Sequence, residues 1–209
     1  MTHPRKSVRR LPVIGVTGGV GTGKSLLASL FVKWGGVLVS GDEIGRKVVN
    51  QSASLRRRLV TVFGPDILTG GKVRRSVLAQ KAFSSSESAE FLNHLVHPPL
   101  LRELNREIER AARSGRHRAV IVDAALLAEW GRRRVHCDCL VGVWAPLALR
   151  NERLRQRGWG DDQIRGRMRS QMPWRARREL VDCVVKNDGS LAMLRRRARL
   201  CWEKALSCD

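Results

Sequence analysis

A short apolar run followed by a helical repeat opens the chain after its first ten residues. Residues 11–17 are mostly apolar and lead into residues 18–23, four of which are glycine. This composition is typical of a buried strand that ends in a glycine-rich turn. The next apolar side chains recur at helical spacing: Leu26, Leu27, Leu30 and Phe31. The pattern therefore predicts a strand, a loop and a helix in that order.

The same alternation returns later in the chain. Further strands are predicted at 37–39, 118–123, 139–144 and 183–186 from their short apolar runs. Helical periodicity follows the first of them at Ile44, Val48 and Val49, and a terminal helix is expected after the turn at 187–189. Four or five strands alternating with helices predict an α/β fold with a three-layer parallel sheet, because right-handed crossovers place helices on both faces.

Two stretches depart from this alternation. Between 51 and 114 we expect helices and no convincing strand, since the turn signals GPD, GG and SSS separate segments of helical periodicity. A second, basic helical stretch at 147–180 is interrupted at 158–160 and at Pro173. The helices expected in the first stretch are 55–63, 73–83, 87–96 and 100–112.

The composition is that of an ordinary globular protein with an unusual charge. Of 209 residues, 43% are hydrophobic and 28% are charged, which excludes disorder and fibrous classes. Lysine and arginine number 40 against 19 acidic residues, a net charge of +21. This balance favours polyanionic partners, so nucleic acids, nucleotides and acidic membrane surfaces all stay open at this point.

Neither a membrane span nor a secretory signal is expected. The longest apolar stretches, 119–128 and 140–149, are interrupted by Asp123 and Pro146 and fall short of the ~20 residues of a spanning helix. The basic N-terminus resembles a signal peptide, but its apolar run breaks within a few residues into glycines.

The cysteines favour a reduced, cytoplasmic chain. They form an odd set without a CxxC pair: Cys137, Cys139, Cys183, Cys201 and Cys208. Buried thiols explain this set better than a disulfide framework. His136 precedes two of these cysteines, yet no second ligand pair follows at zinc-like spacing, so we expect no zinc site there.

The segment GGVGTGKS at 18–25 fits the phosphate-binding loop GxxxxGK[ST] and lies between a predicted strand and a predicted helix. Glycines let the backbone curl so that N–H groups face a phosphate at the helix N-terminus. In such a P-loop Lys24 reaches the β- and γ-phosphates, and the Ser25 hydroxyl supplies one oxygen ligand to magnesium. The motif predicts nucleoside triphosphate binding and leaves the reaction open.

Asp42 follows the second predicted strand, so its carboxylate is expected at the carboxyl edge of the sheet, where ligands of open α/β folds bind. A carboxylate there can accept a hydroxyl proton during phosphoryl transfer. An aspartate before a helix is also a common N-cap. Both roles are compatible with the sequence.

Taken together, five separated motifs resemble the dephospho-coenzyme A kinase family, a nucleoside-monophosphate-kinase-like group of P-loop proteins. The resemblance runs over nearly the whole chain. Asp42 matches the second aspartate of the family's DAD turn, while Gln171, Asp182 and the NDG turn at 187–189 match later positions. The motifs are VIGVTGGVGTGKS, SGDEIGRKVV, LNHLVHP, VDAALLAE and RLRQR.

The resemblance implies transfer of the ATP γ-phosphoryl group to the ribose 3′-hydroxyl of dephospho-coenzyme A, with Mg²⁺ as cofactor. Asp42 would be the base, Lys24, Arg153 and Arg157 would stabilise charge, and Asn187 would contact adenine. Arg46 and His97 would bind the acceptor. The nucleotide would lie on Gly19, Gly21, Thr22, Gly23, Lys24, Ser25 and Leu26.

The resemblance also implies a division of labour within one domain, 1–209. The kinase core would comprise 10–50, 115–146 and 181–209, a helical acceptor-binding insertion 51–114, and a helical lid 147–180. A cytoplasmic monomer is expected, with no specific nucleic acid and no membrane as partner.

The chain departs from the family pattern at four positions. Ser40 replaces the first aspartate of DAD, and Leu26 stands where a hydroxyl residue commonly follows GKS. Ala125 and Ala128 replace a proline and a phenylalanine. Lys24, Ser25 and Asp42 are untouched, so activity is expected with altered substrate affinity.

Two other functions remain as alternatives. A different small-molecule P-loop kinase would share the loop but not the contexts of Asp42 and His97. A nucleic-acid-binding P-loop ATPase is motivated by the net charge and by arginine runs at 56–58, 132–134 and 195–197. Against it, the basic residues are spread along the chain without an aromatic stacking motif.

Overall fold

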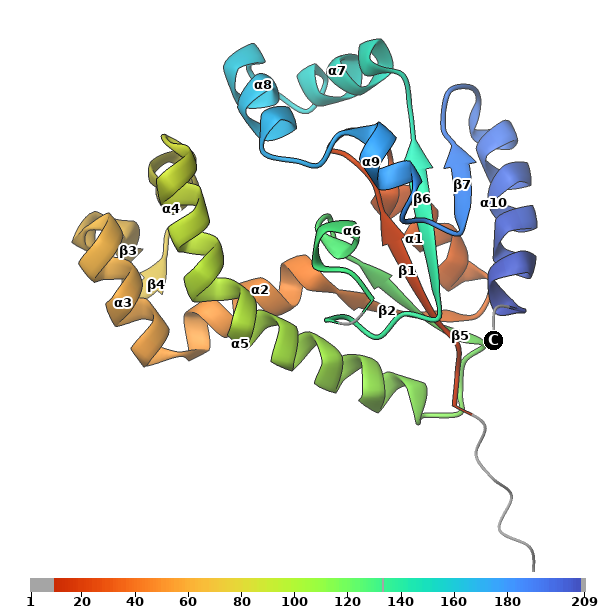
Figure 1. Cartoon of the computed structure of the whole chain (residues 1–209), viewed down its shortest axis with the longest axis horizontal. Helices are drawn as coiled ribbons and strands as arrows, with labels where there is room; N and C mark the ends of the chain where they lie inside the picture. The colour runs from red at the N-terminus through yellow and green to blue at the C-terminus, as the bar shows by residue number, and fades with distance from the viewer. Residues whose placement is uncertain (1–9, 133, 208–209) are drawn as a thin grey trace, which may run out of the picture. The chain divides into compact units, whose positions relative to one another are not determined.

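Five parallel strands form the larger of two sheets in the structure, a computed structural model that describes residues 10–132 and 134–207 (Figure 1). Their order is β2-β5-β1-β6-β7, and every pairing is parallel. The predicted parallel α/β sheet is therefore confirmed. The strands are β1 (Val13–Thr17), β2 (Gly36–Ser40), β5 (Ala119–Asp123), β6 (Cys139–Trp144) and β7 (Cys183–Lys186).

Helices cover both faces of this sheet, which confirms the three layers (Figure 1). On one face Ile14 and Val16 of β1 pack in a core shared with α1 (Lys24–Lys33) and α10 (Leu191–Leu206). Trp202 of α10 is fully buried there, with its ring 5.1 Å from that of Phe31.

On the opposite face, strand glycines let two short helices approach closely. A Cβ on Gly15 would lie 3.3 Å from the side chain of Leu127 in α6 (Leu127–Trp130), and one on Gly142 would lie 3.2 Å from Trp174 in α9 (Trp174–Arg178). Because both faces are covered, the strands are nearly continuous apolar runs, as in other buried parallel sheets.

The chain divides into two compact units. One comprises the residues up to Ser40 together with those from Asn105 onward, and the other comprises Gly41–Leu104. The division into a kinase core, an acceptor-binding insertion and a lid, with boundaries near 50 and 114, stays a prediction. The elements of the second unit are α2 (Gly41–Gln51), α3 (Ala53–Phe63), the 3-10 helix η1 (Pro65–Ile67), β3 (Leu68–Thr69), β4 (Lys72–Val73), α4 (Arg75–Ala82) and the first part of α5 (Ser86–Ala112).

The second unit has its own apolar core. The hydroxyl of Ser52 begins α3 by accepting the N–H of Leu55 at 3.1 Å, the usual role of an N-cap serine. Spacings of three and four residues then place one face of α3 inward. The buried members are Leu55, Leu59, Phe63, Ile67, Val73, Leu78, Ala82 and Leu95.

A small antiparallel hairpin corrects the expectation that this region contains no strand. β3 and β4 pair through Leu68 with Val73 and Thr69 with Lys72. Gly70 and Gly71 join them with φ values of 56° and 74°, and positive φ at both central residues is what a type I′ hairpin turn requires. The strands are too short to produce a period-two pattern in the sequence.

The two helices expected at 87–96 and 100–112 are one helix, α5, which continues through Pro98 and Pro99. Each proline removes a backbone donor and disfavours a helix interior. Leu95 before the prolines and Leu100 and Leu104 after them are buried. Tertiary packing on both sides outweighs the local preference, because most helical stability in proteins comes from such packing.

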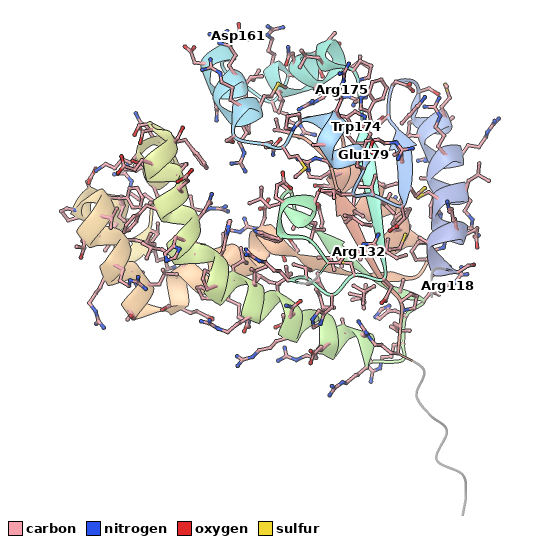
Figure 2. All side chains as sticks on the ribbon, viewed as in Figure 1. Arg118, Arg132, Asp161, Trp174, Arg175 and Glu179 are labelled. Atoms are coloured by element: carbon pink, nitrogen blue, oxygen red, sulfur yellow. The ribbon has the colours of Figure 1, made fainter. Side chains whose placement is uncertain are left out.

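Three helices form the basic stretch, with breaks where the sequence predicts them. They are α7 (Leu147–Arg155), α8 (Asp161–Arg169) and α9; Figure 2 labels Asp161 at the beginning of α8 and Trp174 on α9. In the described part of the chain, no helix is long and apolar enough to cross a membrane. The N-terminal residues 1–9, Arg133 of the run 132–134, and Cys208 lie outside the described residues.

Candidate active site

The P-loop connects the end of β1 to the first turn of α1, as the motif predicts. Gly21 and Gly23 have φ values of 77° and 95°, a left-handed conformation that L side chains rarely adopt. A Cβ on Gly21 would lie 2.9 Å from the carbonyl oxygen of Arg150, and one on Gly23 would lie 2.3 Å from Nδ2 of Asn187. Both glycines are therefore required by conformation and by space.

Hydrogen bonds within the loop meet at one carbonyl group. The Gly19 oxygen accepts the N–H of Thr22 at 3.3 Å and its hydroxyl at 2.8 Å. Nζ of Lys24 also donates to it, at 3.3 Å. Lys24 thus lies over the loop backbone, at the end of α1 that carries the positive helix dipole.

Ser25 and Leu26 lie in the first turn of α1 and are exposed. An exposed hydroxyl at a helix N-terminus is an oxygen donor of the kind that Mg²⁺ prefers. Leu26 supplies a backbone N–H and no hydroxyl, and its side chain is 42% exposed. The presence of leucine here in place of a hydroxyl residue therefore does not involve the core.

Asn187 lies against the P-loop. It follows β7, and its Nδ2 donates to the carbonyl of Thr22 at 2.8 Å. Nη2 of Arg153, on α7, donates to its backbone oxygen at 3.2 Å and to Oδ1 at 3.4 Å. Asn187 is 5% exposed, so the structure joins the loop, the last strand and α7 at this side chain.

The two predicted arginines of the basic stretch differ in environment. Arg153 is half-buried, and its Nη1 is buried without a hydrogen-bond partner among the described residues. Arg157 is exposed and follows the end of α7. An unsatisfied guanidinium nitrogen beside a phosphate-binding loop fits a cation that bonds an anionic ligand, since buried donors normally have partners.

The remaining predicted residues belong to the second compact unit. Asp42 and Arg46 are exposed on α2, and His97 is half-buried in α5. α2 begins at Gly41, so Asp42 lies inside its first turn rather than at the N-cap position. A carboxylate there is stabilised by the helix dipole, and its exposure leaves it accessible to a substrate.

Three further residues contact the P-loop or the strand before it, and the sequence reasoning assigned them no site role. Nε of Arg150 donates to the carbonyl of Val20 at 2.9 Å, and Oε1 of Gln171 accepts the N–H of Val20 at 2.9 Å. Arg177 is 1% exposed and donates to the Thr17 hydroxyl at 2.9 Å. The family resemblance included Gln171 as a matching position, but nothing in the sequence distinguished Arg150 or Arg177 from other arginines.

Arg177 also forms a buried ion pair. Its Nη2 lies 2.7 Å from Oε1 of Glu129, in α6, and its Nη1 donates to the carbonyl of Ala125 at 3.1 Å. Burial lowers the pKa of Arg177, and the carboxylate of Glu129 opposes that shift. The ion pair therefore joins α9 to α6, and the hydrogen bond from Arg177 to Thr17 joins α9 to the carboxyl end of β1.

Comparisons with known proteins agree with this architecture. The family model described as dephospho-CoA kinase matches residues 12–193. A dephospho-CoA kinase of Corynebacterium diphtheriae is 36% identical over 194 residues, 92% of this chain and 96% of that protein. The crystal structure of TT1252 from Thermus thermophilus is 31% identical and superposes with a TM-score of 0.76, covering 95% of this chain and 99% of that one.

A longer relative matches as well. A dephospho-CoA kinase of Mycobacterium tuberculosis is 41% identical over 191 residues, which are 90% of this chain and 46% of that protein. The chain therefore spans about half the length of this relative.

Proposed function

Because this chain belongs to the dephospho-CoA kinase family, we propose that it transfers the γ-phosphoryl group of ATP to the ribose 3′-hydroxyl of dephospho-coenzyme A, giving coenzyme A and ADP. The match of the family model to residues 12–193 carries this proposal, because that range contains the P-loop, Asp42 and Asn187. The match extends far beyond the loop that unrelated P-loop proteins share.

The nucleotide would bind on the P-loop. Backbone N–H groups from Gly19 to Leu26 would surround the phosphates, and Lys24 would contact the β- and γ-phosphates. Mg²⁺ would be held by the Ser25 hydroxyl and the phosphates, and it would neutralise charge that develops on them. The exposed hydroxyl at the start of α1 fits this donor set.

The acceptor would bind residues of the second unit. Asp42 would orient the 3′-hydroxyl and accept its proton as the oxygen attacks the γ-phosphorus. Its exposure on the first turn of α2 supports this role. Arg46 lies four residues later, so that it and Asp42 share one face of the helix, and His97 is the acceptor contact proposed in α5.

Arg153 and Arg157 would stabilise the charge that develops on the transferred group, since phosphoryl transfer depends on positioning and electrostatics. The unsatisfied Nη1 of Arg153 supports this assignment for one of them. For Arg157 the support is its family motif and its exposure.

A coupled ADP-release assay tests the proposal, with dephospho-coenzyme A, adenosine, AMP and shikimate compared as acceptors at equal concentration. We expect Mg²⁺-dependent turnover with dephospho-coenzyme A and formation of coenzyme A. Preference for another acceptor would favour the small-molecule kinase alternative. ADP formed only after a polynucleotide is added would favour the nucleic-acid-binding ATPase.

A monomeric state and a cytoplasmic location belong to the same proposal. Cys137, Cys139, Cys183 and Cys201 are free thiols in the structure, which is typical of a reducing compartment. Gel filtration at several concentrations would test the monomer.

A further inference from the structure

Side chains from outside the P-loop bind two of its carbonyl groups. Arg150 on α7 donates to the carbonyl of Val20 at 2.9 Å, and Asn187 after β7 donates to the carbonyl of Thr22 at 2.8 Å. Arg150 lies 130 residues from Val20 along the chain, and Asn187 lies 165 residues from Thr22. The loop is therefore held by distant segments as well as by its own hydrogen bonds.

These two bonds determine where the next N–H groups point. In a planar trans peptide the C=O of one residue and the N–H of the following residue face opposite sides, and the described residues contain no cis peptide. With the Val20 oxygen held by Arg150, the N–H of Gly21 faces away from Arg150. With the Thr22 oxygen held by Asn187, the N–H of Gly23 likewise faces away from Asn187.

A third side chain, that of Gln171, holds the preceding peptide group, Gly19–Val20, by accepting from its N–H group instead of donating to its carbonyl group. Oε1 of Gln171 accepts the N–H of Val20 at 2.9 Å, so the Gly19 oxygen faces away from Gln171. That oxygen accepts from Thr22 and Lys24 inside the loop. The orientation of the Gly19–Val20 peptide thus supports the position of the Lys24 ammonium group.

We propose that Arg150, Gln171 and Asn187 are positioning residues that hold the peptide groups of the P-loop in the orientation that binds a polyphosphate. The proposal rests on the proposed binding of ATP at this loop and is independent of the acceptor. It assigns Asn187 a role at the phosphates through the loop, in place of an adenine contact.

Burial and charge support this assignment. Asn187 is 5% exposed, and both polar atoms of its side chain have partners, Thr22 and Arg153. Burial lowers the pKa of Arg150, and the nearby charge of Arg177 lowers it further. A bound polyphosphate would stabilise this cation, since opposite charges favour each other's ionised forms.

Inorganic tripolyphosphate separates the two roles of Asn187, because it carries the phosphates and lacks the base. Isothermal titration with Mg²⁺ would measure the Kd of ATP and of tripolyphosphate for the wild-type chain, Asn187→Leu and Gln171→Met. Both substitutions remove a hydrogen-bonding group without changing net charge. Gln156→Met is the matched control, since Gln156 is exposed and bonds Glu152 within the same helical turn.

We expect both substitutions to raise the Kd of ATP and of tripolyphosphate by a common factor of about 5 or more, because one backbone group loses its partner. The control should change neither constant, and the KM for dephospho-coenzyme A should stay at its wild-type value. A purely structural role would lower the melting temperature and leave both constants unchanged.

Weaker binding of ATP with unchanged binding of tripolyphosphate would overturn the proposal for Asn187 in favour of an adenine contact. Unchanged constants in folded variants would overturn it altogether. If Asn187→Leu fails to fold, Gln171→Met and Arg150→Lys decide the question. The titrations contain no acceptor, so a failure to phosphorylate dephospho-coenzyme A would contradict the proposed function and leave this inference standing.

Discussion

The two compact units differ in the range of the contacts that shape their candidate sites. Around the P-loop, hydrogen bonds join residues 130, 151 and 165 positions apart. In the unit Gly41–Leu104, side chains that bind the backbone span shorter distances, such as 23 residues from Asn50 to Val73 and 3 from Ser52 to Leu55.

This difference has a consequence for mutation. The backbone of the P-loop is held by side chains scattered over the last third of the chain. We therefore expect phosphate binding to be sensitive to substitutions far from the motif. The proposed acceptor residues Asp42, Arg46 and His97 form the acceptor end and lie on α2 and α5, helices that pack against the separate core of that unit. Substitutions there are expected to act locally, and four predictions test the contrast.

The largest effect is expected for Lys24→Ala. The change removes a charge that we propose contacts the β- and γ-phosphates, where stabilisation of developing charge contributes several kcal/mol. Turnover should fall by about 10³-fold or more at saturating ATP. A variant with a rate near wild type would contradict the P-loop assignment. A melting curve of the variant should verify that it is folded.

Asp42→Asn tests the acceptor end. If Asp42 orients or deprotonates the 3′-hydroxyl, kcat should fall by about 10²–10⁴-fold. Stability should change little, because an exposed first-turn carboxylate contributes only about 0.3–1 kcal/mol through the helix dipole. The measurement pairs kcat with the melting temperature, and ATP affinity verifies an intact P-loop. An active variant would exclude the catalytic role.

Arg177→Met tests the long-range contacts that Arg177 makes with Glu129 and with Thr17, the last residue of the strand before the P-loop. It leaves Glu129 without its buried partner, and breaking such a pair typically costs about 3–5 kcal/mol. Urea unfolding should show this loss in the free energy of unfolding. Arg175→Met is the control, since Arg175 is exposed on the same helix (Figure 2). Equal losses in the two variants would refute a special role for Arg177.

The smallest effect concerns the pH dependence of stability at Asp182. Partial burial would raise the pKa of this carboxyl, but hydrogen bonds from Arg132 and from the Leu140 N–H outweigh it, so the pKa is lowered from 3.8. A lowered native pKa stabilises the fold above the unfolded value, and this stabilisation is lost as pH falls below about 4. Arg132, the ion-pair partner of Asp182, is labelled in Figure 2.

Asp182→Asn should therefore lower the free energy of unfolding at pH 7 by about 1 kcal/mol, a modest figure because the pair is partly exposed. The difference from wild type should shrink as pH decreases below about 4. Asp162→Asn, whose carboxylate is almost fully exposed, is the control. A difference that is constant with pH would contradict the ion-pair explanation.

Local pattern was sufficient for most of the fold. Apolar runs located all five strands of the parallel sheet, and glycine and proline located the breaks between α7, α8 and α9. It failed where tertiary packing opposed local preference: α5 continues through two prolines, and the hairpin β3-β4 is too short for a period. The P-loop was predictable because its conformation needs particular residues at fixed spacing.

By itself, then, the sequence determined the strand order along the chain, the phosphate-binding loop and the family, since each depends on residues close together or on ordered motifs. Only the tertiary structure decided which of many arginines matter at the loop. Arg150 and Arg177 look like any other member of a basic helical stretch, and the sheet brings them to the backbone of Val20 and the hydroxyl of Thr17. Hydrogen bonds across more than a hundred residues leave no periodic signal, because they depend on where folded segments meet rather than on local composition.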